Sequence, residues 1–247
     1  MINIKSYGSG SKGNMYIVSS STTNIILECG IPEESMLKVL NANKLNRKNI
    51  SAVFTSHAHR DHSLTINYFD FYNIKCYTTY ETYLKYDLSD DNFVRLEDNK
   101  IYKIGDIQIL AFRVFHGKTD CFGFIFKDKE DTILFITDFM ECAKNLSKFK
   151  FTQVFIECNY LVEEWEKASK KTDLIDDLKR KYERQLNTHM SLDNLMTHLD
   201  YMDLTKCKKI TLIHTSEDLG NRDIMKNAII DKYGINCVCL LSNGKEY

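Results

Sequence analysis

The feature that most constrains the fold is a cluster of three histidines and one aspartate within six residues. It reads His57-Ala-His59-Arg-Asp61-His62, and the apolar run Ile50–Thr55, which predicts a buried strand, leads directly into it. A spacing of two places the side chains of His57 and His59 on one side of an extended turn. Asp61 and His62, at the start of the next helix, can point to a second ion. The cluster therefore predicts two adjacent metal sites on one loop; a polar loop that titrates in water is the alternative.

Composition indicates a globular chain without a general affinity for polyanions. Its 247 residues are 43% hydrophobic, which suffices for a core, and a single proline with no Gly/Ser-rich stretch marks no linker. We therefore expect one domain over 1–247. Lysine and arginine number 33 against 34 acidic residues, for a formal charge of -1. No global positive field thus indicates a nucleic acid or an acidic membrane, although a local basic patch stays compatible.

Apolar segments and cysteines bear on the compartment. No apolar run has the length of a signal peptide or of a membrane span, so we expect a cytoplasmic protein with no membrane partner. The eight cysteines include no CxxC pair, which favours reduced, mostly buried thiols over disulfides or a zinc knuckle. The sequence does not reveal the oligomeric state, and a homodimer is left open.

Hydrophobic patterning predicts strands in the first part of the chain and more helices in the last third. The predicted strands of the first part are 2–7, 14–19, 24–29 and four runs between about 99 and 137, of which Ile107–Phe115, Cys121–Lys127 and Thr132–Thr137 are the clearest. A helix is predicted to begin at Pro32. Further along we predict helices near 162–186, 191–202 and 221–233 and strands at 209–214 and 235–241. Strands followed by helices, twice over, predict an α/β fold of two sheets back to back with helices outside.

The spacing His-x-His-x-Asp-His resembles the signature of the metallo-β-lactamase superfamily. The resemblance implies an αββα sandwich, in which two mixed β-sheets pack face to face with helices outside. The diiron oxygen-reducing branch has Glu at the second position, so His59 points to zinc instead. We therefore expect two Zn²⁺ ions as cofactors, with Mn²⁺ as the alternative.

The resemblance implies three further ligands downstream, and the sequence offers a candidate for each. His116, in Val114-Phe115-His116-Gly117, would be the third ligand of the first zinc. Asp138, after the apolar Phe135-Ile136-Thr137, would bridge both ions, and His214, after Leu212-Ile213, would bind the second. Each of these residues alone is more often a cap or a surface polar residue. Their order, and their common place at the carboxyl ends of strands, favour the ligand set.

Other segments bear on the branch within the superfamily. Leu27-Glu28-Cys29-Gly30 stands where the superfamily usually carries Asp-x-Gly, so a carboxylate is kept but its usual contact is in doubt. The opening Gly8-Ser-Gly-Ser-Lys-Gly-Asn14 resembles the start of the YycJ-type bacterial exonuclease branch, and a tight turn is its alternative explanation. Glu157-Cys-Asn-Tyr160, the charged helix and Thr188-His189-Met-Ser191 resemble the same branch.

His189 is the main candidate outside the ligand set. In ribonuclease Z-like enzymes, a histidine before the last helix that precedes the fifth motif touches the phosphate and can protonate the leaving oxygen, paired with a carboxylate. The resemblance implies this role for His189, with Glu157 as its orienting partner. The alternative is that His189 caps the helix beginning near Ser191. His198 is interpreted as structural.

The implied activity is hydrolysis of a nucleotide phosphodiester. Two metal ions can bring the pKa of a bridging water to about 7, Asp61 would orient the attacking proton, and His189 would donate to the leaving alkoxide. The branch resemblance and His189 both point to a phosphate substrate, whereas hydrolysis of a thioester or lactone would leave both unexplained. The absence of a basic arm favours a small cyclic nucleotide, the substrate of viral phosphodiesterases of this superfamily that defeat Pycsar defence. The alternatives are a YycJ-type 5′-exonuclease acting on single-stranded ends and, in another class, a non-catalytic metal-binding interaction protein, against which the intact ligand set argues.

Overall fold

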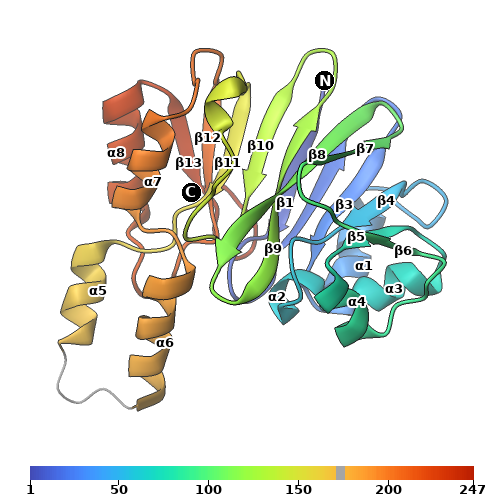
Figure 1. Cartoon of the computed structure of the whole chain (residues 1–247), viewed down its shortest axis with the longest axis horizontal. Coiled ribbons are helices and arrows are strands. Elements are labelled where there is room, and N and C mark those ends of the chain that lie inside the picture. Colours follow the sequence, from blue (N-terminus) through green and yellow to red (C-terminus); the bar gives the residue numbers. More distant parts are fainter. Residues whose placement is uncertain (171–175) are drawn as a thin grey trace.

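Two mixed β-sheets lie face to face at the centre of the molecule, with helices on their outer sides (Figure 1). The computed structural model describes residues 1–170 and 176–247. The six-stranded sheet has the order β1 (Asn3–Gly8), β2 (Met15–Ser19), β3 (Asn24–Cys29), β4 (Ala52–Phe54), β5 (Cys76–Thr78), β6 (Phe93–Arg95). The seven-stranded sheet has the order β13 (Asn236–Cys239), β12 (Lys209–Ile213), β11 (Gln153–Glu157), β10 (Thr132–Ile136), β9 (Thr119–Lys127), β8 (Ile107–His116), β7 (Lys100–Ile104). The predicted α/β architecture is confirmed.

The helices are short and cover the outer faces of the sheets. Their bounds are α1 Glu33–Ala42, α2 Arg60–Ser63, α3 Ile66–Phe71, α4 Tyr80–Tyr86, α5 Val162–Ser169, α6 Asp176–Thr188, α7 Leu192–Asp200 and α8 Arg222–Tyr233, with a 3₁₀ turn at Leu146–Lys148. In Figure 1, α1 to α4 lie beside the first sheet and α7 and α8 beside the second. None of the helices in the described ranges combines the length and the apolar character that crossing a bilayer requires.

Aromatic side chains from both sheets fill the space between them. Tyr16 of β2 meets Phe135 of β10 edge to face, with ring centroids 4.9 Å apart. Phe54 of β4 meets Phe124 of β9 in the same way at 5.8 Å. All four side chains are fully buried. Such pairs add about 0.5–1.5 kcal/mol each beyond the area that they bury, so they help to fix the two sheets against each other.

The predicted helix over 162–186 is wrong as one element. The structure has α5 and α6 in this region, and the part of the prediction at 171–175 lies outside the described residues. The indole Nε1 of Trp165 donates a hydrogen bond to the carbonyl oxygen of Tyr182 at 2.9 Å. One straight helix would hold residues 17 positions apart at about 25 Å, so α5 and α6 must pack against each other.

Three strands and two helices have no counterpart in the sequence prediction. They are β5, β6, β11, α3 and α4. β11 is the informative case, because its residues after Gln153 are all buried. A parallel strand covered on both faces lacks the alternation of apolar and polar residues on which strand prediction relies.

The parallel parts of the two sheets position the site. β3 and β4 run parallel in the first sheet, and β10, β11 and β12 run parallel in the second. The segments that follow β4, β10 and β12 carry His57, Asp138 and His214. Carboxyl ends of parallel strands open on one edge of a sheet, so these side chains converge where the two sheets meet.

Candidate metal centre

The segment after β4 is held by contacts that aim His57 inward. The backbone N–H of Ser56 donates to Oε1 of Glu28, at the end of β3, at 3.1 Å. The hydroxyl of Ser56 lies 2.9 Å from Nδ1 of His57, whose side chain is fully buried. Nδ1 is therefore occupied by a neighbour within the loop, and Nε2 is the nitrogen that faces the other histidines.

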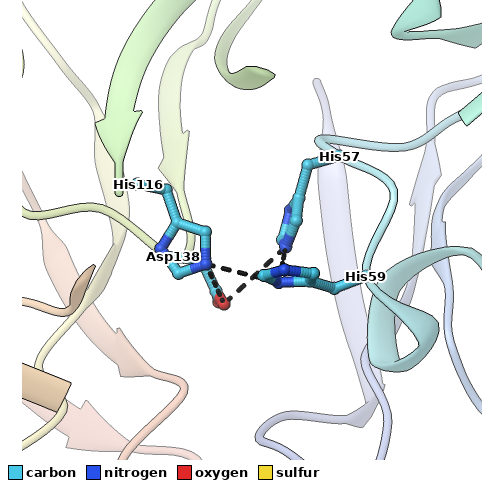
Figure 2. A group of neighbouring side chains, drawn as sticks. All are labelled: His57, His59, His116 and Asp138. Atoms are coloured by element: carbon cyan, nitrogen blue, oxygen red, sulfur yellow. Dashed lines mark hydrogen bonds and ion pairs between the residues drawn. The ribbon is translucent and has the colours of Figure 1, made fainter. Parts of the chain in front are cut away.

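The first group of candidate ligands consists of His57, His59, His116 and Asp138 (Figure 2). Nε2 of His57 lies 2.8 Å and Nε2 of His116 lies 3.3 Å from Nδ1 of His59. Oδ2 of Asp138 lies 3.9 Å from His57 and 3.6 Å from His116. His116 approaches the carbonyl oxygen of Thr188 with Nδ1 at 2.7 Å, and a carbonyl only accepts. Nδ1 of His116 therefore carries the proton, and in the neutral ring Nε2 is left with a lone pair for a metal.

The second group consists of Asp61, His62, Asp138 and His214. Oδ1 of Asp138 lies 3.3 Å from Nε2 of His62 and 3.3 Å from Nδ1 of His214. Oδ2 of Asp61 lies 3.5 Å from His62 and 3.6 Å from Nε2 of His214. Asp138 thus belongs to both groups and turns one carboxylate oxygen to each. The structure brings together all seven residues that the resemblance implied, in the two sets that it implied.

The chemistry of these donors fits divalent cations. Burial lowers the pKa of His57, and burial with the neighbouring imidazole of His116 lowers the pKa of His59 to about 4, so both rings are neutral near pH 7. Burial also opposes a charge on His214, but the carboxylates of Asp138, Asp61 and Glu157 outweigh it and raise its pKa to about 10. The first group therefore offers neutral imidazoles as ligands. In the second group, the carboxylates favour a positive charge, which a metal ion would supply. Buried Nδ1 of His62 and Nε2 of His214 have no hydrogen-bond partner in the described part of the chain.

Backbone strain is concentrated at the same place. Seven non-glycine residues in the described ranges have positive φ, and three of them are Glu28, Asp138 and His214, with φ of 59°, 28° and 53°. Each such conformation costs about 1–3 kcal/mol, and such conformations cluster at functional sites. All three residues lie within two positions of the end of a strand, where the turn in the backbone can redirect a side chain from the sheet toward the cluster.

The glycine-rich segment 8–14 is more than a tight turn, because it lies against both metal motifs. The hydroxyl of Ser9 accepts a hydrogen bond from the backbone N–H of His214 at 3.0 Å. Asn14 donates from its backbone N–H and from Nδ2 to the carbonyl oxygen of Asp61, at 2.8 and 3.0 Å. A Cβ on Gly30 would lie 1.7 Å from that same carbonyl oxygen. Sequence reasoning missed the roles of Ser9 and Asn14; the Gly-Ser run was the only local signal.

Glu28 retains a contact with the second ligand group. Its side chain is fully buried, and Oε2 lies 3.4 Å from Nδ1 of His62. The carboxylate also accepts from Ser56, as described above. Glu28 therefore contacts the candidate ligand His62 directly. Through Ser56 it also holds the segment after β4 that carries His57.

Glu157 and His189 form a pair beside the ligands. Nδ1 of His189 lies 2.7 Å from Oε1 of Glu157. The fully buried Glu157 also lies 3.0 Å from Nδ1 of His214 and accepts from the backbone N–H groups of Phe139 and Met190 at 2.9 and 3.2 Å. Burial would raise the pKa of Glu157, but His189 and His214 outweigh it and lower it, so the carboxylate is ionised. Its oxygens are already engaged, which makes it an orienting group rather than a metal ligand.

His189 does not cap the following helix. The hydroxyl of Ser191 accepts from the backbone N–H of Asn194 at 3.2 Å and is the N-cap of α7. The side chain of His189 is 11% exposed and lines the cleft instead. His198 belongs to none of the candidate ligand groups and lines a separate cavity, with its ring 5.8 Å from that of Phe139.

A cleft with two lobes lies over the cluster. The catalytic lobe, of about 400 Å³, is lined by Ser11, His59, Arg60, Asp61, His116, Gly117, Lys118, Thr119, Asp138, Arg184, Thr188, His189 and His214. The outer lobe, of about 300 Å³, is lined by Gly10, Ser11, Lys12, Asn159, Lys181, Arg184, Gln185, His189, His214, Thr215, Ser216, Glu217, Asp218 and Ser242. The two lobes share Ser11, Arg184, His189 and His214, so a ligand can occupy both at once.

Comparisons with known proteins identify the family and the fold. The family described as the beta-lactamase superfamily domain matches residues 23–215. No curated protein matches the sequence.

Solved structures match almost the whole fold. A metallo-beta-lactamase fold protein, YhfI of Bacillus subtilis, is 13% identical over 100% of this chain and 99% of its own, with a TM-score of 0.74. A diphosphatase from the PhnP family is 15% identical over 100% and 97%, with a TM-score of 0.68. The short form of human tRNase Z is 15% identical over 87% and 93%, with a TM-score of 0.60. Identities this low establish the fold alone, the metallo-beta-lactamase fold.

Proposed function

The chain belongs to the metallo-β-lactamase superfamily, and we propose that it is a dinuclear metal-dependent phosphodiesterase acting on nucleotides. His57, His59 and His116 would hold one ion; Asp61, His62 and His214 would hold the other; Asp138 would contact both. Nitrogen-rich sets of this kind suit Zn²⁺, and Mn²⁺ is the alternative. When bound, the ions would supply hydroxide at neutral pH and neutralise charge on a phosphate.

The pair of Glu157 and His189 is the observation that carries the proposal. A carboxylate at 2.7 Å from Nδ1 fixes the imidazole so that Nε2 carries the chemistry on the cleft side. A ring held in this way can give a proton from Nε2 to a leaving oxygen. An alkoxide leaving from a phosphodiester needs that proton, whereas hydrolysis of a lactone or thioester needs no such group beside the metals. Asp61 would orient the proton of the attacking water.

Unpaired cations at the rim of the catalytic lobe support an anionic substrate. Arg60, Lys118 and Arg184 all line it. None of the three has a carboxylate within 4.0 Å among the described residues. Two unit charges 4 Å apart attract by about 1 kcal/mol in water and about 4 kcal/mol near a protein surface. A phosphate over the metals would therefore find cations available, at no cost in broken ion pairs.

A small cyclic nucleotide is the favoured substrate. The formal charge of the chain is -1, and no basic arm extends the cationic rim into a track for a polynucleotide backbone. A cyclic nucleotide presents one phosphodiester with an alkoxide leaving group, which matches one metal pair and one general acid. Hydrolysis of single-stranded ends is the second activity to be tested.

The test is a product assay with purified protein on cyclic nucleotides, single-stranded DNA and single-stranded RNA in parallel. We expect a cyclic nucleotide to give a nucleoside monophosphate with Zn²⁺ or Mn²⁺ and no product with a chelator. Asp138→Asn should be inactive, while Asp177→Asn, a matched change of a side chain that is 90% exposed, should behave like wild type. Release of mononucleotides from DNA or RNA ends alone would identify an exonuclease. No turnover of any substrate, including bis(p-nitrophenyl) phosphate, would favour a non-catalytic metal-binding protein.

A further inference from the structure

The outer lobe contains two buried polar atoms that lack hydrogen bonds. They are Oε1 of Gln185 and Oγ1 of Thr215, on residues that are 6% and 4% exposed. Neither atom has a partner within the described ranges, and both residues line the same cavity of about 300 Å³. Native proteins satisfy about nine in ten buried polar groups, so two exceptions on residues that line one cavity, together with His189, require an explanation.

The surrounding network fixes what Gln185 can offer. Nδ2 of Asn159 donates to the carbonyl oxygen of His214 at 2.7 Å, so the amide of Asn159 turns its Oδ1 the other way. Nε2 of Gln185 donates to that Oδ1 at 3.0 Å. The backbone of the candidate ligand His214 thus fixes the amide of Asn159, which in turn fixes the amide of Gln185. Oε1 of Gln185 is left as an acceptor without a donor. A group that satisfies it must bring an N–H or an O–H.

The charges of the outer lobe disfavour a second phosphate there. Lys12 pairs with Glu217 at 2.7 Å, and Lys181 pairs with Asp218. Each lysine of this lobe is therefore neutralised by a carboxylate, in contrast to Arg60 and Lys118 of the catalytic lobe. Arg184 lies between the two lobes. The cleft thus has a cationic half over the ligands and a nearly neutral, polar half beside it.

We propose that the outer lobe is the nucleoside subsite, in which Gln185 and Thr215 determine specificity by hydrogen bonding to the sugar or the base. The inference rests on the proposed phosphodiesterase activity and names the part of the substrate that the metals do not hold. The phosphate lies over the ligands, and the uncharged nucleoside extends past His189 into the outer lobe. A volume of about 300 Å³ is within the range of small-ligand sites.

Two substrates separate this subsite from the reaction itself. The p-nitrophenyl ester of thymidine 5′-monophosphate carries N–H and O–H donors, whereas bis(p-nitrophenyl) phosphate carries none. Thr215→Val is nearly isosteric, and the hydroxyl that it removes makes no hydrogen bond to the described residues. The substitution should lower kcat/KM on the nucleoside ester by about 5- to 30-fold, mainly through KM. Activity on bis(p-nitrophenyl) phosphate should stay within about twofold, because a phosphate over the metals does not reach the hydroxyl.

Gln185→Met should shift the ratio of the two kcat/KM values in the same direction. Loss of its bond to Asn159 would affect both substrates, so the ratio isolates the part that belongs to the nucleoside. Gln108→Met, on the exposed side of β8, is the matched control and should change neither value. Loss of activity by the same factor on both substrates, or no loss on the nucleoside ester, would overturn the subsite.

A binding measurement keeps the subsite testable even if the protein hydrolyses neither ester. In calorimetry on the metal-loaded protein, thymidine 5′-monophosphate should bind more tightly than inorganic phosphate, and Thr215→Val should weaken only the nucleotide, by a similar 5- to 30-fold. Analogues methylated at the base N3 or lacking the 3′-hydroxyl should identify the donor, since one of them will bind as weakly to wild type as the nucleotide binds to the variant. Equal binding of nucleotide and phosphate would refute the subsite. Absence of turnover together with selective nucleotide binding would refute only the phosphodiesterase.

Discussion

Replacement of His189 by alanine is the most direct test of the proposed chemistry. The substitution removes the imidazole that Glu157 holds at 2.7 Å and leaves all seven candidate ligands in place. Because Glu157 also accepts from Phe139 and Met190, its carboxylate keeps backbone partners after the change. We therefore expect an intact fold and an unchanged metal content, with proton delivery as the function that is lost.

The expected size of the loss follows from the leaving group. A positioned general acid contributes about 10²–10⁴-fold, so hydrolysis of a nucleotide diester with an alkoxide leaving group should slow by that factor. p-Nitrophenolate needs little protonation, so bis(p-nitrophenyl) phosphate should be hydrolysed at a rate within about tenfold of wild type. The two substrates together distinguish a missing proton from a missing nucleophile.

The assay compares kcat on both substrates and includes metal analysis of each variant. His198→Ala is the matched control, because His198 belongs to none of the candidate ligand groups and lines a separate cavity. The reasoning is refuted if His189→Ala slows both substrates equally, which would indicate a role in binding or folding, or if it slows neither.

Four further predictions concern the candidate metal ligands and the backbone that packs against them. Elemental analysis should find close to two transition-metal ions per chain, and fewer than one after supplementation with zinc or manganese would contradict the dinuclear site. Asp138→Ala should abolish activity and loosen both ions, since a group shared by both ligand sets is lost and two cations would repel at close range; near-normal turnover and metal content would show that Asp138 is not a shared ligand. Gly30→Ala should destabilise the fold by about 1–3 kcal/mol in urea titrations and reduce metal content, because the added Cβ would lie 1.7 Å from the carbonyl oxygen of Asp61; wild-type stability would refute that clash. In the metal-free protein, the folded pKa of His59 is about 4 and the unfolded one about 6.5, so protons bind the unfolded chain first as the pH falls. His59→Gln should therefore lose less stability than wild type between pH 7 and pH 5, and an equal loss in urea midpoints would contradict this.

The candidate ligands were predictable because their signals are local. His57 and His59 stand in one short run, His116 ends a strand, and Asp138 and His214 come shortly after apolar strands. The parallel arrangement then brings the strand ends to one edge without further information from the sequence. The resemblance supplied the pairing of Glu157 with His189, which the structure places at 2.7 Å.

Other parts of the site depend on contacts between distant segments and could not be predicted. Ser9 contacts His214 across 205 positions, and nothing in the first ten residues indicates this partner. Gln185 lies in a charged helix whose sequence alone does not show which side faces a cavity. The separation of α5 from α6 likewise depends on a tertiary contact between Trp165 and Tyr182, while the local composition favours helix throughout.

Glu28 shows how the structure resolves a departure that the sequence only flags. The residue is the last but one of β3 and has a φ of 59°, and its side chain contacts the segment that follows β4. One carboxylate then serves two neighbours, the backbone N–H of Ser56 and the imidazole of His62. These neighbours flank His57, so a displacement of Glu28 would shift ligands of both groups together. The side chain is one methylene longer than that of Asp, yet its carboxylate lies within contact distance of both the loop after β4 and the second ligand group. Residue type alone could not have revealed that placement, because it depends on how β3 and β4 lie side by side.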